Sequence, residues 1–269
     1  MSTRAPAGAQ AVQEDRTTGF PLMELPFVGF LLAIMAGAMN AWTLANASTF
    51  STVQSGNVVS LGYWLVQGNW DKLWFPALSV LAFGLGSALC GILMTSFLRS
   101  GRTFTVAVLV AQMLLLVLFG VLALTLVGEG SGNEAALDLT ADHSLTAHWI
   151  AIGISFVAGA QGNAFHKNHG MLYGNIAVTS VVQMAFNFLM QAAFTKQGPN
   201  GETNIKWAGI FFLTILGFSG GAAIGFWADQ ALVNGASIFI PPIIALGLVL
   251  VAAGRKLENV DPTPGGTFV

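Results

Sequence analysis

Eight apolar stretches that contain no Asp, Glu, Lys or Arg constrain this chain more than any other feature. They cover residues 26–45, 53–67, 73–98, 103–127, 148–164, 172–194, 207–228 and 235–253. A helix that crosses about 30 Å of hydrocarbon needs roughly 20 residues, so most of these stretches are long enough to span a bilayer. Only 8% of the 269 residues are charged, against about 25% in soluble domains. The sequence therefore predicts an all-α, polytopic transmembrane bundle and excludes an ordinary soluble protein.

Three polar segments divide the chain. Residues 1–24 and 255–269 hold little apolar surface, so we expect flexible tails. Residues 128–146 form an acidic loop between two membrane parts, residues 25–127 and 147–254. The net charge of −2 and the lack of clustered Lys and Arg exclude nucleic acid as a partner.

The two membrane parts contain corresponding motifs in the same order. Three pairs match: Ala36–Ala41 with Ala158–Ala164, Val53–Gly56 with Ala177–Ser180, and the ladder Ala82, Gly86, Cys90 with Gly217, Gly221, Gly225. The small residues of the ladders predict close helix packing. An odd number of crossings per copy inverts the second copy, as in many transporters. The sequence thus predicts two inverted repeats.

The distribution of Lys and Arg favours one topology, because these residues accumulate on the cytoplasmic side. With cytoplasmic termini and short or re-entrant segments at 53–67 and 172–194, nine of the ten Lys and Arg residues face the cytoplasm and only Lys72 lies outside. If all eight stretches cross, seven of the ten do. We therefore predict about three full spans plus one short segment per repeat, with eight full spans as the alternative.

Two asparagines, Asn40 and Asn163, lie at corresponding places in the first and fifth stretches. An amide in hydrocarbon must find hydrogen-bond partners, so each should face the bundle interior or a cavity. Two interpretations stay open: the amides bind neighbouring helices, or they meet at one midplane site that binds a substrate.

The short second segment opens with Ser55, Gly56 and Asn57, and Thr179 and Ser180 hold the equivalent place. If such a segment is a half-helix, its N-terminus would point polar N–H groups and a positive dipole end into the protein. Ordinary helix capping is the alternative. Further polar residues, Gln183, Asn187 and Gln191, recur every four positions and should share one helix face. We expect this face to point inward and, with the turns, to bind substrate.

Gly37 to Asn40, Phe50 and Ser55-Gly56-Asn57 together resemble the signature of the YoaK-type family of bacterial membrane proteins, a domain of unknown function. The second half resembles it through Gly159 to Ala164 and Thr179-Ser180. The resemblance implies a multi-pass protein of the bacterial inner membrane. Asn40 stands where the family usually carries Asp, so no carboxylate for proton coupling is implied at this position.

The sequence carries no nucleotide-binding loop, no paired cysteines and no intramembrane carboxylate pair. We therefore expect neither an enzyme nor a resident cofactor or metal. The expected function is a transporter or facilitator of a small polar solute, with its site between the repeats and the lipid bilayer as its surroundings. The alternative is a non-transporting scaffold or partner subunit. Substrate, energy coupling and any homo-oligomer stay open.

Overall fold

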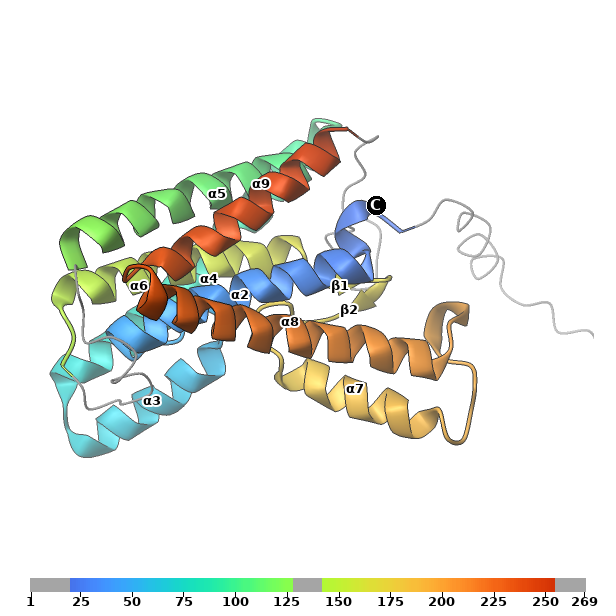
Figure 1. Ribbon diagram of the computed structural model, residues 1–269, viewed down its shortest axis with the longest axis horizontal. Coiled ribbons are helices and arrows are strands. Elements are labelled where there is room, and N and C mark those ends of the chain that lie inside the picture. The colour runs from blue at the N-terminus through green and yellow to red at the C-terminus, as the bar shows by residue number, and fades with distance from the viewer. Residues whose placement is uncertain (1–19, 128–141, 255–269) are drawn as a thin grey trace, which may run out of the picture.

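The computed structural model describes residues 20–127 and 142–254 (Figure 1). The first part contains η1 (Leu22–Glu24), α2 (Pro26–Ala47), α3 (Gln54–Gln67), α4 (Trp70–Arg99), α5 (Thr105–Leu122) and the π-helical turn η2 (Ala123–Val127). The second contains α6 (Leu145–Ala164), β1 (Lys167–Asn168), β2 (Met171–Leu172), α7 (Thr179–Gln191), η4 (Pro199–Gly201), α8 (Asn204–Ala231), η5 (Ala236–Phe239) and α9 (Ile240–Ala253). The predicted all-α bundle is confirmed, and the short antiparallel hairpin β1–β2 is its one addition in the described residues.

Side chains that accept hydrogen bonds from the first turn explain where several helices begin. Asn69 accepts from the backbone N–H of Lys72 at 3.1 Å and starts α4. Ser144 accepts from the N–H of Ala147 at 3.1 Å and starts α6. These are ordinary N-caps, which satisfy donors that a helix cannot pair internally.

Five segments of the described chain are long and apolar enough to cross a membrane: Pro26–Ala47, Trp70–Arg99, Thr105–Val127, Asn204–Ala231 and Ala236–Ala253. We predicted about six full crossings. The 20-residue helix α6 is not among the five, and it carries the polar residues His148, Gln161 and Asn163.

The second stretch of each half contains a short helix, as we expected. Helix α3 has 14 residues and α7 has 13, so each covers about 20 Å at 1.5 Å per residue. The stretch 172–194 suggested a longer helix, but α7 begins only at Thr179 because the chain before it forms β2 and a loop.

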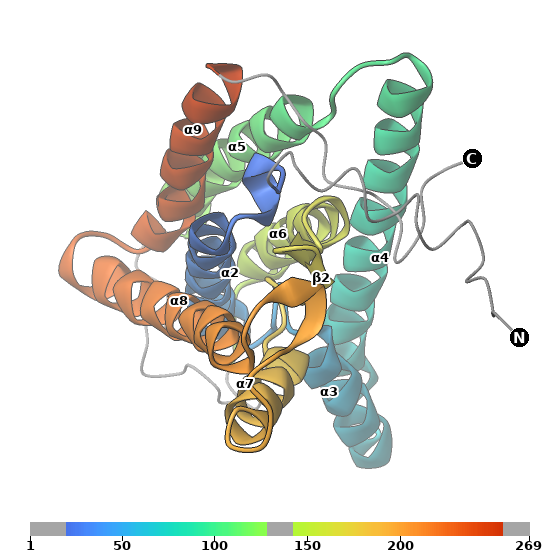
Figure 2. The ribbon, with the colours of Figure 1, turned by 90° about the vertical axis from the view of Figure 1, so that its right-hand side faces the viewer.

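Helices α2 and α6 lie in the centre of the bundle, and the other helices surround them (Figure 2). Helix α2 packs against α8, and α6 packs against α4. On the outside, α3 lies on α4, α7 lies on α8, and α5 lies beside α9. In α4, exposed side chains such as Leu81, Leu85 and Ile92 form an outer apolar face suited to lipid.

Two hydrogen bonds show that α2 and α6 run in opposite directions. At one end, Ser48 Oγ after α2 lies 2.7 Å from His143 Nε2 before α6. At the other end, the N–H of His169 after α6 donates to the carbonyl of Glu24 before α2 at 2.6 Å. We call these the Ser48 end and the hairpin end.

Glycines allow the central helices to approach their partners backbone to backbone. A Cβ at Gly37 of α2 would lie 2.1 Å from the carbonyl oxygen of Phe218, and one at Gly159 of α6 would lie 2.0 Å from that of Phe83. The ladder residues lie at the same two interfaces: Gly217, Gly221 and Gly225 of α8 face α2, and Gly86 of α4 faces α6. Of the remaining ladder residues, Cys90 is buried and Ala82 is half-buried.

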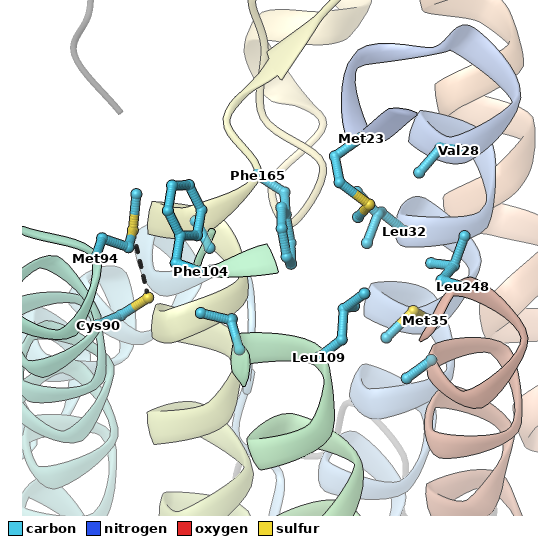
Figure 3. Close-up of a cluster of buried hydrophobic side chains, with 13 residues drawn as sticks. Met23, Val28, Leu32, Met35, Cys90, Met94, Phe104, Leu109, Phe165 and Leu248 are labelled. Atoms are coloured by element: carbon cyan, nitrogen blue, oxygen red, sulfur yellow. Dashed lines mark hydrogen bonds between the residues drawn. The ribbon is translucent and has the colours of Figure 1, made fainter. Parts of the chain in front are cut away.

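One hydrophobic cluster holds the hairpin end together (Figure 3). It joins Met23 of η1, Leu32 of α2, Phe104 before α5 and Phe165 after α6, and these four side chains are fully buried. Residues 20–24 therefore belong to the fold rather than to the flexible tail expected over 1–24. The other residues of both tails, and 128–141 of the acidic loop, lie outside the described residues.

Candidate functional site

A layer of small polar side chains lies where α3, α4 and α6 meet. Asn57 Nδ2 is 3.0 Å from Ser79 Oγ, and Ser79 Oγ is 2.8 Å from Ser155 Oγ. All three residues are buried in the bundle. Asn57 also accepts from the N–H of Phe50 at 3.0 Å and donates to the Phe50 carbonyl at 2.6 Å, so its amide fixes the start of α3. We call these three residues the Asn57–Ser79–Ser155 layer.

Asn40 organises the connection between α2 and α3. Its Oδ1 accepts from the N–H of Ser51 at 3.0 Å, from Ser51 Oγ at 3.2 Å and from the N–H of Thr52 at 3.1 Å. Its Nδ2 donates to Thr52 Oγ1 at 2.5 Å. This network pairs backbone groups that would otherwise be left unpaired inside the bundle, where no water replaces them.

A pocket of about 220 Å³ opens at the Ser48 end. Its polar lining includes Ser48, Thr49, Ser60, Asp71, Lys72, Asp142, His143 and His148. Lys72 Nζ lies 3.2 Å from Asp142 Oδ1 and 5.5 Å from the ring centroid of Trp64. The ring of His148 stacks on Phe75 at 3.7 Å. We call this the first pocket; it presents charges of both signs beside aromatic rings.

A second pocket of about 390 Å³ lies toward the hairpin end, between α4 and the chain from α6 to α7. Its lining comprises Phe83, Ser87, Gly159, Gly162, Asn163, His166, Leu172 and Ile176. His166 Nδ1 lies 2.8 Å from the Asn163 carbonyl oxygen.

The polar layer lies between the two pockets. Along α4, Pro76 lines the first pocket, Ser79 belongs to the layer and Phe83 lines the second pocket, with about one helical turn between successive members. Along α6, Ser155 likewise lies between His148 and Gly159. The seam of α3, α4 and α6 is therefore hollow at both ends and closed in its middle by neutral hydrogen-bonding groups.

The structure does not bring Asn40 and Asn163 together. Gln161 Nε2 donates to the Leu32 carbonyl at 3.0 Å, which places these two residues at the same level. Asn40 is eight residues beyond Leu32, about 12 Å along the axis, and Asn163 lies on the other side of that level because α2 and α6 are antiparallel. Asn40 therefore holds a loop, whereas Asn163 lines the second pocket.

The other residues predicted to bind substrate have mixed positions. Asn57 is in the layer, and Gly56 makes room for the Phe50 ring, 2.5 Å from the position of a Cβ. Ser55, Thr179, Ser180, Gln183 and Asn187 are all exposed. The polar face of α7 thus points outward, contrary to our expectation, because Val181, Ala185 and Phe188 form its buried face against α8.

Sequence reasoning missed Ser79 and Ser155, because a single serine in an apolar stretch resembles any small packing residue. The signal that could have found them is a hydroxyl near the middle of a long apolar helix, which in hydrocarbon must pair with something. Within residues 20–127 and 142–254, no three His, Cys, Asp or Glu side chains come together as a metal site would require.

Comparison with known proteins identifies the family. A family model described as "Protein of unknown function (DUF1275)" matches residues 28–252, which is most of the chain. No curated protein and no solved structure matches it. Because the matched region runs from the first membrane-length helix to the last, the likeness concerns the whole helical bundle. The chain belongs to the DUF1275 family of proteins of unknown function, and it is a membrane-embedded helical bundle.

Proposed function

We propose that this protein is a transporter or facilitator that moves a small polar solute along the seam of α3, α4 and α6. The single observation that supports this most is the pair of pockets at opposite ends of the seam, separated by the Asn57–Ser79–Ser155 layer. A solute in either pocket is about one helical turn from hydroxyl and amide groups that can exchange their mutual hydrogen bonds for bonds to it.

Matching contacts support inverted repeats as the frame of this pathway. The contact between Gly37 and the Phe218 carbonyl has a counterpart between Gly159 and the Phe83 carbonyl. The offset from α2 to α6 is 122 (159 minus 37), and the offset from α4 to α8 is 135 (218 minus 83). The same offsets relate Gly86 at Phe156 to Gly221 at Ile34. Since α2 and α6 are antiparallel, the second copy is inverted.

The neutral layer favours a facilitator, or a carrier coupled to Na⁺ through neutral oxygens. None of the three layer residues titrates near neutral pH, so the layer itself offers no group for proton coupling. The setting in a bacterial inner membrane with cytoplasmic termini belongs to this proposal. It is supported by the YoaK-type resemblance and by the distribution of Lys and Arg.

Thiol labelling tests whether the seam is hydrated. In a Cys90→Ala background, single cysteines replace Ser60 of the first pocket, Ser87 of the second pocket and Leu85 on the lipid-facing side of α4. We expect a membrane-impermeant methanethiosulfonate to modify Ser60→Cys from one side of the membrane and Ser87→Cys from the other, with Leu85→Cys unreactive. If both pocket cysteines react as slowly as Leu85→Cys, the seam is dry and the scaffold alternative is favoured.

Flux measurements test transport itself. Purified protein in liposomes is challenged with a panel of small neutral polar solutes, and we expect at least one to equilibrate faster than in empty liposomes. Ser155→Leu fills the layer and should reduce that flux by about tenfold or more. Ser96→Leu is the matched control, because Ser96 is exposed and bonds only its own helix, at the Ile92 carbonyl. Flux unchanged by Ser155→Leu would contradict a pathway through the layer.

A further inference from the structure

A side pocket of about 190 Å³, separate from the proposed pathway, lies between α4 and α5 on the surface of α6. Its walls include Leu89 and Leu93 of α4, Ala111 of α5, and Phe156 and Ala160 of α6. Leu89 is 53% exposed and Leu93 is 37% exposed, and both belong to the outer apolar face of α4. The side pocket therefore opens toward lipid, so molecules dissolved in the membrane can reach it.

One amide lines this apolar pocket. Gln112 of α5 is 3% exposed, and its Oε1 has no hydrogen-bond partner. A buried acceptor without a donor is unfavourable in an apolar environment, and in the middle of a membrane no water relieves it. The acceptor thus marks the place where a ligand can supply a donor.

The hydrogen bonds around Gln161 fix which way the Gln112 amide points. Gln161 Nε2 donates to the Leu32 carbonyl at 3.0 Å, so Gln161 Oε1 is the atom left to face Gln112. Gln112 Nε2 donates to that oxygen at 2.5 Å. Turning the Gln112 amide over would set two carbonyl oxygens against each other. The unpartnered atom of Gln112 is therefore its oxygen, an acceptor.

We propose that the side pocket binds a membrane-soluble phenol whose hydroxyl donates to Gln112 Oε1. A cavity of about 150 Å³ holds benzene, so this slightly larger one suits a single ring with one or two small substituents. Phe156 offers an aromatic surface to such a ring. The ligand class differs from the polar solute of the seam, and neither proposal depends on the other.

Two probes that differ by one donor test this assignment. p-Cresol carries a hydroxyl, and 4-methylanisole is its methyl ether without the donor. With the full-length protein in nanodiscs, after subtraction of partitioning into empty nanodiscs, we expect p-cresol to bind about tenfold more tightly, the effect of one hydrogen bond to a buried acceptor. Equal affinities, or no binding of either probe, would overturn the proposal.

Variants locate the effect. Gln112→Met keeps the length of the side chain but removes the acceptor, so the preference for p-cresol should fall to about onefold. Leu118→Met, at an exposed position of α5 outside the side pocket, should keep the full preference. A second variant, Ala160→Phe, fills the pocket while Gln112 stays in place, and it should weaken p-cresol binding at least tenfold. A preference that survives both Gln112→Met and Ala160→Phe places the phenol elsewhere and refutes the site.

Discussion

The connection before α3 and the connection before α7 solve the same problem with different chemistry. Each must pair backbone groups where a half's first helix gives way to a short second helix, at a depth where water does not reach. In the first half, the buried amide of Asn40 bonds Ser51 and Thr52. In the second half, Asn175 donates to the Phe165 carbonyl, and Gln161 Nε2 lies 3.5 Å from Asn175 Oδ1.

The second connection also uses charged groups, which the first does not show in its bonds to Asn40. Glu24 Oε2 accepts from the N–H of Gly170 at 3.1 Å. His169 Nε2 lies 2.8 Å from Glu202 Oε1, and Lys206 Nζ lies 2.6 Å from the same oxygen. The first connection is therefore held by neutral groups inside the bundle, and the second partly by ionic groups at its surface.

An inserted residue explains why matching asparagines have different roles. Gly159 keeps the offset of 122 from Gly37, but Asn163 is 123 residues from Asn40. One extra residue rotates the following helix by about 100°, so Asn163 points toward the second pocket and lies 3.6 Å from Met94 Sδ. Position 162, at the true offset from Asn40, is a glycine without a side chain, and Gln161 reaches the loop instead. Equivalent sequence positions in the two halves thus do not guarantee equivalent roles.

The largest expected effect tests whether the two connections hang on the same frame. Gly37→Ala and Gly159→Ala each place a Cβ about 2 Å from a backbone carbonyl oxygen. Since neither backbone can move without separating a central helix from its partner, we expect each variant to lose more than about 3 kcal/mol of stability. Thermal unfolding and the yield of monodisperse protein measure this loss.

Matched controls are Gly84→Ala of α4 and Gly209→Ala of α8, where no heavy atom lies within 4 Å of the added Cβ. These changes should be neutral or should stabilise their helices by up to about 1 kcal/mol. If Gly159→Ala is tolerated while Gly37→Ala is not, the two halves do not share one packing frame and the comparison of their connections fails.

The frame could be predicted from the sequence, whereas the connections could not. Apolar length, the short second segments and the glycine ladders follow from local periodicity, and membrane packing leaves few alternatives for them. The role of Asn40 depends on a loop eleven residues away, and pairing of Ser79 with Ser155 depends on residues 76 positions apart. The exposed stripe of α7 was misjudged for a similar reason, since three-residue and four-residue spacing identifies a face but not the side of the bundle it points to.

An intermediate effect should rank the amides. Asn40→Ala leaves the N–H groups of Ser51 and Thr52 without their partner, so we expect a loss of about 3 kcal/mol. Gln161→Ala removes the bond to the Leu32 carbonyl, which lies within a helix, and should cost about 1–2 kcal/mol. Asn163→Ala loses only a weak contact with sulfur and should change stability by less than about 0.5 kcal/mol.

Chemical denaturation in mild detergent, read by tryptophan fluorescence, would give this order. An Asn163→Ala variant as damaging as Asn40→Ala would contradict the difference in roles that the inserted Gly162 creates, and would restore the two asparagines as equivalents.

The smallest effect concerns pH and separates the neutral connection from the ionic one. The hydrogen bonds from Lys206 and His169 hold the pKa of Glu202 below its ordinary value of 4.5. A carboxyl group whose pKa is lowered by folding stabilises the protein above its ordinary pKa, and this contribution is lost as the pH falls through the lowered value. Because the pair is at the surface, the change in Tm should be only about 1–2 °C.

The measurement compares wild type with Glu202→Gln at pH 7 and near pH 3.5. At pH 7, Glu202→Gln should unfold at the lower temperature, and the difference should shrink in acid because the wild-type carboxyl becomes protonated as well. High salt should reduce the difference too, since it screens an exposed pair. Asn40→Ala supplies the contrast: its larger loss should be the same at both pH values, because the bonds it removes join groups that do not titrate. A loss from Asn40→Ala that followed pH as Glu202→Gln does would mean that the first connection also depends on charge.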